Sequence, residues 1–109
     1  MNKDFFVCYS DEAKEDLRNI YVYIAFDLQS KDNAKEQVNR IREAIKGLKS
    51  FPKRNPCVQY EPWRSLGMRR LNVDNFAIFY LVAEENKRVE IVRIPYGARD
   101  LEKFFENMV

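Results

Sequence analysis

The sequence predicts a single α+β domain in which an antiparallel helical hairpin packs on one face of a small antiparallel sheet. Three observations lead to this class. Two consecutive stretches have helical apolar spacing, three short strand-like runs follow them, and the 109 residues are 46% hydrophobic and 14% aromatic. This length fits one domain, residues 1–109, with one core. The expected order is strand, helix, helix, three strands and a short C-terminal helix.

The N-terminal part of the chain predicts a strand and a long helix. Phe5–Tyr9 is a short apolar and aromatic run that is typical of a strand. Ser10 can cap the following helix, and the two acids after it favour a helix N-terminus. Apolar residues then recur every three or four positions from Ala13 to Leu28. We therefore expect a helix of about 18 residues with one buried face.

A second amphipathic helix follows the short polar segment Leu28–Asn33. Ser30 or Asp32 can cap this helix, and its apolar face runs through Ala34–Leu48. Pro52 ends it, because proline disfavours helical geometry at the residue before it. A short connection between two amphipathic helices indicates an antiparallel hairpin whose apolar faces belong to the core.

Three strands are predicted in the second half of the chain, at Arg69–Val73, Phe76–Val82 and Val89–Ile94. The turns between them are short, so neighbouring strands must be antiparallel. The middle run is continuously apolar, which indicates a central strand that is covered on both sides. Residues 53–68 contain two prolines and are expected to form a loop. Arg99–Met108 has helical apolar spacing and predicts the short C-terminal helix.

The charge distribution distinguishes one segment of the chain. Residues 51–73 contain five Lys or Arg side chains against one acid, whereas the whole chain carries a net charge of only +2. A local basic patch on a nearly neutral body indicates a site for a phosphate backbone or an acidic partner. The alternative is a solvated basic loop without a ligand.

The composition disfavours several classes of function. There is no histidine, so we expect no zinc site, no hydrolase triad, no metal and no cofactor. Cys8 and Cys57 lack ligand spacing and are expected to be reduced thiols in the cytoplasm. Gly47, Gly67 and Gly97 are isolated, so there is no glycine-rich phosphate loop. We also expect no signal peptide and no membrane-spanning segment.

The basic segment and the last predicted strand contain residues suited to metal-independent RNA cleavage. This reaction needs a base for the ribose 2′-hydroxyl, a cation for the developing charge and an acid for the leaving oxygen. Glu61 is the candidate base, Arg99 or Arg69 the cation, and Tyr96 the acid. The candidates for nucleic-acid or phosphate binding are Trp63, Arg64, Arg69, Arg70 and Arg93. The structural alternative is that these arginines only pair with nearby acids.

Taken in order, these features resemble the RelE/ParE superfamily of bacterial toxins from type II toxin–antitoxin pairs. The residues that carry the resemblance are Ala13-Lys14-Glu15-Asp16-Leu17, Phe51-Pro52, Gly67-Met68-Arg69-Arg70-Leu71, Phe76-Ala77-Ile78-Phe79-Tyr80 and Ile94-Pro95-Tyr96-Gly97-Ala98-Arg99-Asp100. The resemblance spans nearly the whole chain. It implies a small cytoplasmic growth inhibitor that a cognate antitoxin holds inactive by wrapping a disordered or helical segment around it.

The resemblance leaves two targets open. RelE-like toxins cleave mRNA in the ribosomal A site, whereas ParE-like toxins poison DNA gyrase and cleave nothing. Arg99 matches an arginine that RelE-like enzymes use, and Glu61-Pro62 loosely matches an acid–proline pair of the YoeB-like branch. Two departures weigh against RNA cleavage: Ala77 replaces an arginine of the central strand, and Phe105 replaces a C-terminal catalytic tyrosine. Pro95 stands where the YoeB-like branch has a histidine.

The sequence thus predicts a toxin that acts by ribosome-dependent mRNA cleavage, because the loop with Glu61, Trp63 and Arg64 is typical of an RNA surface. One alternative is a gyrase poison that acts by protein–protein contact. Another is a degenerate, non-toxic member that only binds an antitoxin. The expected partners are the cognate antitoxin and either ribosome-bound mRNA or DNA gyrase.

Overall fold

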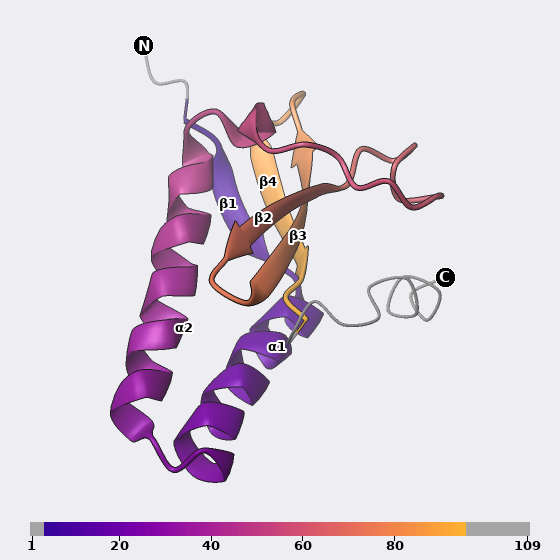
Figure 1. Ribbon diagram of the computed structural model, residues 1–109. Helices are drawn as coiled ribbons and strands as arrows, with labels where there is room; N and C mark the ends of the chain where they lie inside the picture. The colour runs from indigo at the N-terminus through magenta and orange to yellow at the C-terminus, as the bar shows by residue number, and fades with distance from the viewer. Residues whose placement is uncertain (1–3, 96–109) are drawn as a thin grey trace.

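The computed structural model has two layers, a helical hairpin and a four-stranded sheet (Figure 1). The structure describes residues 4–95. Its elements are β1 (Phe6–Tyr9), α1 (Asp11–Val22), the π-helical turn η1 (Tyr23–Asp27), α2 (Lys31–Lys46), the 3-10 turns η2 (Gly47–Lys49) and η3 (Pro52–Arg54), β2 (Arg69–Val73), β3 (Phe76–Ala83) and β4 (Arg88–Arg93). This order confirms the predicted α+β class. The predicted C-terminal helix lies outside the described residues.

The strand order in the sheet is β1-β4-β3-β2. The pairs β2–β3 and β3–β4 are antiparallel, as predicted, but β1 pairs with β4 in parallel, so the sheet is mixed. The reason lies in the connection. The two helices return the chain to the start of β1, where the Phe5 amide donates to the Lys49 carbonyl (2.8 Å). Three strands of alternating direction then follow, and the third has the direction of β1.

The helical hairpin begins as predicted but changes geometry at its tip. The Ser10 hydroxyl oxygen accepts a hydrogen bond from the Ala13 amide (3.0 Å) and donates to the Val92 carbonyl (2.7 Å). After Val22 the chain continues as the π-helical turn η1, which shifts the later side chains around the helix axis. Leu28, which α-helical spacing placed on the buried face, is therefore 55% exposed, and that part of the prediction is wrong.

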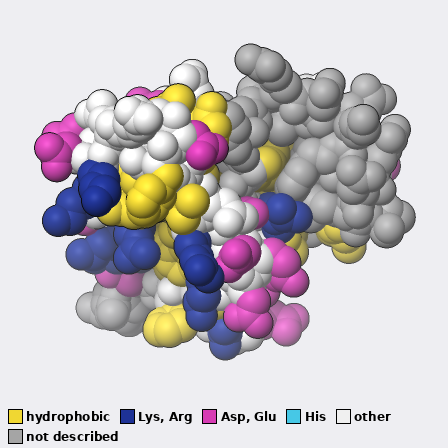
Figure 2. Space-filling view, turned by 90° about the horizontal axis from the view of Figure 1, so that it is seen from below, with side chains coloured by type: hydrophobic (Ala, Val, Ile, Leu, Met, Phe, Trp, Pro, Cys, Tyr) yellow, Lys and Arg dark blue, Asp and Glu magenta, His cyan; other side chains and the backbone are white. Residues whose placement is uncertain are grey.

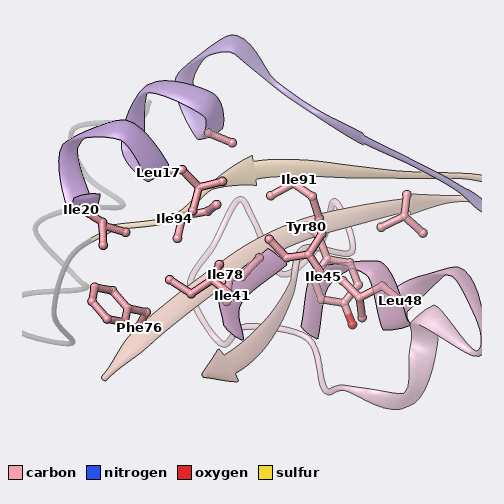
Figure 3. Packing of buried hydrophobic residues seen from close by; sticks show 12 residues of the cluster. Leu17, Ile20, Ile41, Ile45, Leu48, Phe76, Ile78, Tyr80, Ile91 and Ile94 are labelled. Carbon is pink, nitrogen blue, oxygen red and sulfur yellow. The ribbon is translucent and has the colours of Figure 1, made fainter. Parts of the chain in front are cut away.

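The main core lies between the hairpin and the sheet. Figure 3 shows residues of α1 and α2 facing residues of β3 and the end of β4. Its fully or nearly buried members are Ala13, Leu17, Ile20, Ile41, Ile45, Leu48, Phe76, Ile78, Tyr80, Val89, Ile91 and Ile94. The predicted apolar faces of both helices thus belong to the core.

A smaller cluster covers the opposite face of the sheet. Ala77 and Phe79 of β3 pack there against Val58 and Met68, which come from the segment before β2. Trp63 packs on the edge of this cluster. The predicted central position of β3 is confirmed, since its side chains are buried on both faces. The second cluster also holds the basic segment against the sheet.

Candidate functional site

The loop before β2, residues 55–68, lies within the basic segment 51–73, and we call it the basic loop although its own two charges, Glu61 and Arg64, balance. It projects beyond the sheet from the start of β2 (Figure 1). At its base the Val58 amide donates to the Met68 carbonyl (2.8 Å), and Met68 is completely buried. Further out, the Met68 amide donates to the Trp63 carbonyl (2.9 Å). A loop that the sequence left without regular structure is therefore fixed by its own hydrogen bonds and by apolar packing.

Glu61, the predicted base, lies on this loop and is bonded on both carboxylate oxygens. Oε1 accepts the Ser65 amide (2.8 Å) and Oε2 accepts the Ser65 hydroxyl (2.8 Å). These two hydrogen bonds lower the pKa of Glu61 below its ordinary value of 4.5. The lowered pKa makes the Glu61 carboxylate a weaker proton acceptor than a carboxylate with the ordinary pKa. Its geometry is that of a side chain which holds a turn.

We expect Glu61→Ala to loosen the basic loop more than Ser65→Ala, because Glu61→Ala removes both hydrogen bonds whereas Ser65→Ala keeps the one donated by the backbone amide. The measurement is amide hydrogen exchange at residue 65, which should become faster mainly in Glu61→Ala. Adding Ser65→Ala to Glu61→Ala should change little more, since the acceptor is already gone. Because the pKa of Glu61 is lowered, this protection should be complete above pH 4.5 and disappear as the pH falls through the folded-state pKa.

A base role for Glu61 makes a different prediction. In that case Glu61→Gln would abolish toxicity, whereas Ser65→Ala would leave it nearly unchanged. The four-residue spacing between Glu61 and Ser65 is the signal in the sequence that could have indicated the turn. Sequence reasoning missed Ser65 because only the folded loop shows that its hydroxyl meets the carboxylate.

Arg69 and Arg70 are on opposite faces of β2, as adjacent strand residues must be. The Arg69 guanidinium donates to the carbonyls of Lys53 (3.2 Å) and Asn55, and so joins the start of the basic loop to the sheet. Arg70 donates to the Asn72 side chain (2.6 Å) and lies 6.0 Å from the ring centroid of Phe79. Arg69 is therefore bonded to backbone, and Arg70 is the half-buried cation beside the loop.

Arg93, the third strand arginine, is directed to a helix. Its Nε and Nη2 atoms donate to the two carboxylate oxygens of Asp16 on α1 (2.7 and 3.0 Å). The hydrogen bond to Asp16 raises the pKa of Arg93 above its ordinary value. This arrangement matches the structural alternative, in which arginines pair with acids. Asp16 was missed because its partner is 77 positions away in the sequence.

Polar and aromatic side chains from β2, β3 and the basic loop lie together in one groove. A groove of about 620 Å³ runs between the loop and the open face of β2. Its polar and aromatic lining includes Asn55, Cys57, Tyr60, Arg70, Asn72 and Phe79. Ala77, which the sequence resemblance predicts to replace an arginine, is buried beneath the loop and adds no charge to this groove.

The remaining predicted site residues are distributed over different places. Arg64 is exposed on the outer part of the loop, whereas Trp63 is half-buried against the second cluster. Arg99 and Tyr96 lie outside the described residues, as does Phe105. Their roles stay predictions.

Residues 4–95 offer neither a candidate metal-binding cluster nor a membrane-spanning helix. Within residues 4–95 no group of three or more His, Cys, Asp or Glu side chains is placed to hold a metal ion. No helix in the same range has the length and apolarity needed to cross a membrane. Cys8 is a half-buried free thiol and Cys57 an exposed one.

Comparison with protein families identifies the group to which the fold and these residues belong. The family described as the ParE toxin of the type II toxin–antitoxin system parDE matches residues 7–101. The chain belongs to the ParE toxin family. Comparison with curated proteins found no match.

Solved structures with the same fold come from both branches of the ParE/RelE superfamily. The chromosomal ParDE system of P. aeruginosa gives a TM-score of 0.71 at 23% identity, with 88% of this chain and 99% of that chain covered. The RelBE2 toxin–antitoxin complex of Mycobacterium tuberculosis gives a TM-score of 0.62 at 16% identity, with 85% of this chain and 98% of that chain covered. A free mutant of the E. coli toxin RelE gives a TM-score of 0.62 at 12% identity, with 96% of this chain and 95% of that chain covered. At these identities the likeness shows the fold alone.

Proposed function

We propose that this toxin of a type II pair inhibits DNA gyrase by direct protein–protein contact, and that its cognate antitoxin prevents this contact. The observation that carries the proposal is the bonding of Glu61. Both oxygens of the only acid in the basic segment hold Ser65, so the candidate base is used to shape the loop. Arg69 and Arg93 are bonded to backbone carbonyls and to Asp16, respectively. Membership of the ParE family also supports gyrase, and not mRNA, as the target.

The basic loop has the chemistry of a protein-binding surface. Its outer part exposes Tyr60, Arg64 and Leu66, and the Leu66 side chain is 62% exposed. Tyrosine and arginine are enriched among the residues that dominate binding energy at protein interfaces. The loop is also held in shape before a partner arrives, which reduces the entropy lost on binding. We assign the gyrase contact to Tyr60, Arg64 and Leu66.

The rival function is ribosome-dependent mRNA cleavage, which one observation favours. The groove beside β2 places Arg70, Asn72 and Tyr60 together, and these side chains could hold a phosphate and stack on a base. In that mechanism Arg99 would stabilise the charge and Tyr96 would serve as the acid, as predicted from the sequence. A non-toxic member that only binds an antitoxin is the third reading.

We expect the purified toxin to inhibit supercoiling by DNA gyrase and to leave mRNA intact in a reconstituted translation reaction. Arg64→Glu combined with Leu66→Asp should weaken gyrase inhibition at least about tenfold, as for residues at the centre of an interface. The matched control is Lys35→Glu, which changes an exposed charge on α2. In cells, DNA synthesis should stop before protein synthesis.

Two results would contradict parts of this proposal. Cleavage of mRNA by the purified toxin, with gyrase unaffected, would establish the rival function and make the Arg70 groove the site to mutate. Inhibition of gyrase that the loop variants do not change would place the contact elsewhere, with residues 99–109 as the next segment to test.

A further inference from the structure

The start of β1, the end of α2 and the β3–β4 turn lie at one end of the sheet (Figure 1). A second groove is found there. It has a volume of about 720 Å³ and is not part of the site described above. We call it the sheet-end groove. It is formed by Asp4, Phe5, residues 50–54, Glu84 and Lys87.

Phe51 is the most informative residue of the sheet-end groove. Its backbone is left-handed, with φ 54° and ψ 57°, and its side chain is 83% exposed. A bulky residue in this conformation is strained, whereas Asn or Gly adopts it more readily. Folding therefore provides no reason for a phenylalanine here. An exposed aromatic side chain held on strained backbone indicates a contact with another molecule.

The sheet-end groove combines an apolar floor with a positive rim. Phe5 lies under Lys87, whose Nζ atom is 5.6 Å from the ring centroid. Lys53 is paired with Glu84 (2.9 Å). Arg54 and Lys87 take part in no ion pair within residues 4–95. Two cations are thus placed beside Phe5 and Phe51 and can meet carboxylates of a partner.

Figure 2 shows a contrasting surface, the side of the molecule opposite to this end of the sheet. Hydrophobic side chains are exposed there too, with both Lys or Arg and Asp or Glu side chains around them. At the hairpin tip Phe26 is exposed, and Lys31 is 5.9 Å from its ring centroid. Phe26 lines neither of the two grooves described, so the tip is a suitable control surface.

The position of the sheet-end groove indicates which partner it fits. Residues 53–55 connect the groove to the basic loop, and the Arg69 guanidinium is bonded to the carbonyls at both ends of this short segment. A polypeptide seated in the groove therefore lies next to the start of the basic loop. A protein that blocks the toxin fits this placement.

We propose that the sheet-end groove binds a segment of the cognate antitoxin. This segment inserts an aromatic or branched aliphatic side chain beside Phe5 and Phe51, and it sets acidic side chains against Arg54 and Lys87. The inference rests on the toxin–antitoxin pairing of the proposed function. It depends on the target surface proposed above only for the step in which the antitoxin blocks the toxin. The binding itself does not depend on gyrase being the target.

The test is the affinity of the full-length toxin for the purified antitoxin encoded next to its gene. Phe51→Asn should raise Kd at least about tenfold, as expected for an aromatic anchor at an interface. Its melting temperature should stay the same or rise, because asparagine tolerates the left-handed backbone. Arg54→Glu should also raise Kd and reduce the salt dependence of binding. The matched control, Phe26→Asn, should leave Kd unchanged.

Three results would overturn the inference. Unchanged antitoxin affinity in both Phe51→Asn and Arg54→Glu would mean that the antitoxin does not use the groove. Loss of gyrase inhibition with full antitoxin affinity would assign the groove to the target. Loss of toxin self-association in sedimentation, again with full antitoxin affinity, would assign it to a second copy of the chain. Because Kd is measured without gyrase, failure of the gyrase proposal would leave this test unaffected.

Discussion

We expect Ile41→Asp to unfold the domain. Ile41 lies on the buried face of α2 and is 0% exposed, within the cluster that joins the hairpin to the sheet (Figure 3). A carboxylate placed there would have neither water nor a partner, which costs about 3–7 kcal/mol. This is of the order of the whole stability of a small domain. Circular dichroism with urea or thermal unfolding measures the effect.

Arg42→Asp is the control for this substitution. It introduces the same carboxylate one residue further along α2, at an exposed position. We expect this variant to stay folded, with a change in stability typical of surface substitutions, within about 0.5 kcal/mol. If Ile41→Asp retained a cooperative transition near that of the parent chain, the assignment of the buried face would be wrong.

The second large effect is expected for Asp16→Ala, with a loss of about 2–3 kcal/mol in the free energy of unfolding. The Asp16 side chain is only 12% exposed and that of Arg93 30%. Besides both Arg93 bonds, Asp16 accepts the Ile94 amide (2.8 Å). Its removal leaves a partly buried guanidinium and a backbone amide without these bonds. Urea unfolding of the variant and the parent chain gives the difference.

Glu15→Ala provides the comparison on the neighbouring position. Its carboxylate is 3.9 Å from Arg18, and both side chains are exposed, so little stability depends on this pair. The double variant Asp16→Ala with Arg93→Ala should recover part of the loss, because the guanidinium that has lost the Asp16 carboxylate is then removed as well. An Asp16→Ala variant as stable as Glu15→Ala would show that the ion pair does not fasten α1 to β4.

In the candidate site, the residue types could be read from the sequence, but the role of each side chain depends on the partners that it contacts in the folded protein. Composition alone distinguishes the basic segment 51–73 from the rest of the chain, and its functional role stays a prediction. The sequence could not predict that Glu61 would be bonded to Ser65, because both oxygens meet that residue only in the folded turn. The choice between a binding and a structural arginine likewise depends on distant partners, as Asp16 shows for Arg93.

Within residues 4–95, the sequence by itself determined the order of the main helices and strands, most of the buried faces of both helices and the central position of β3. These follow from local periodicity and turn residues, which act over a few positions. Only the tertiary structure decided the parallel pairing of β1 with β4, the π-helical turn that exposes Leu28, and the grooves on either side of residues 53–55. Such features depend on contacts between segments far apart in the chain, and local spacing contains no record of these contacts.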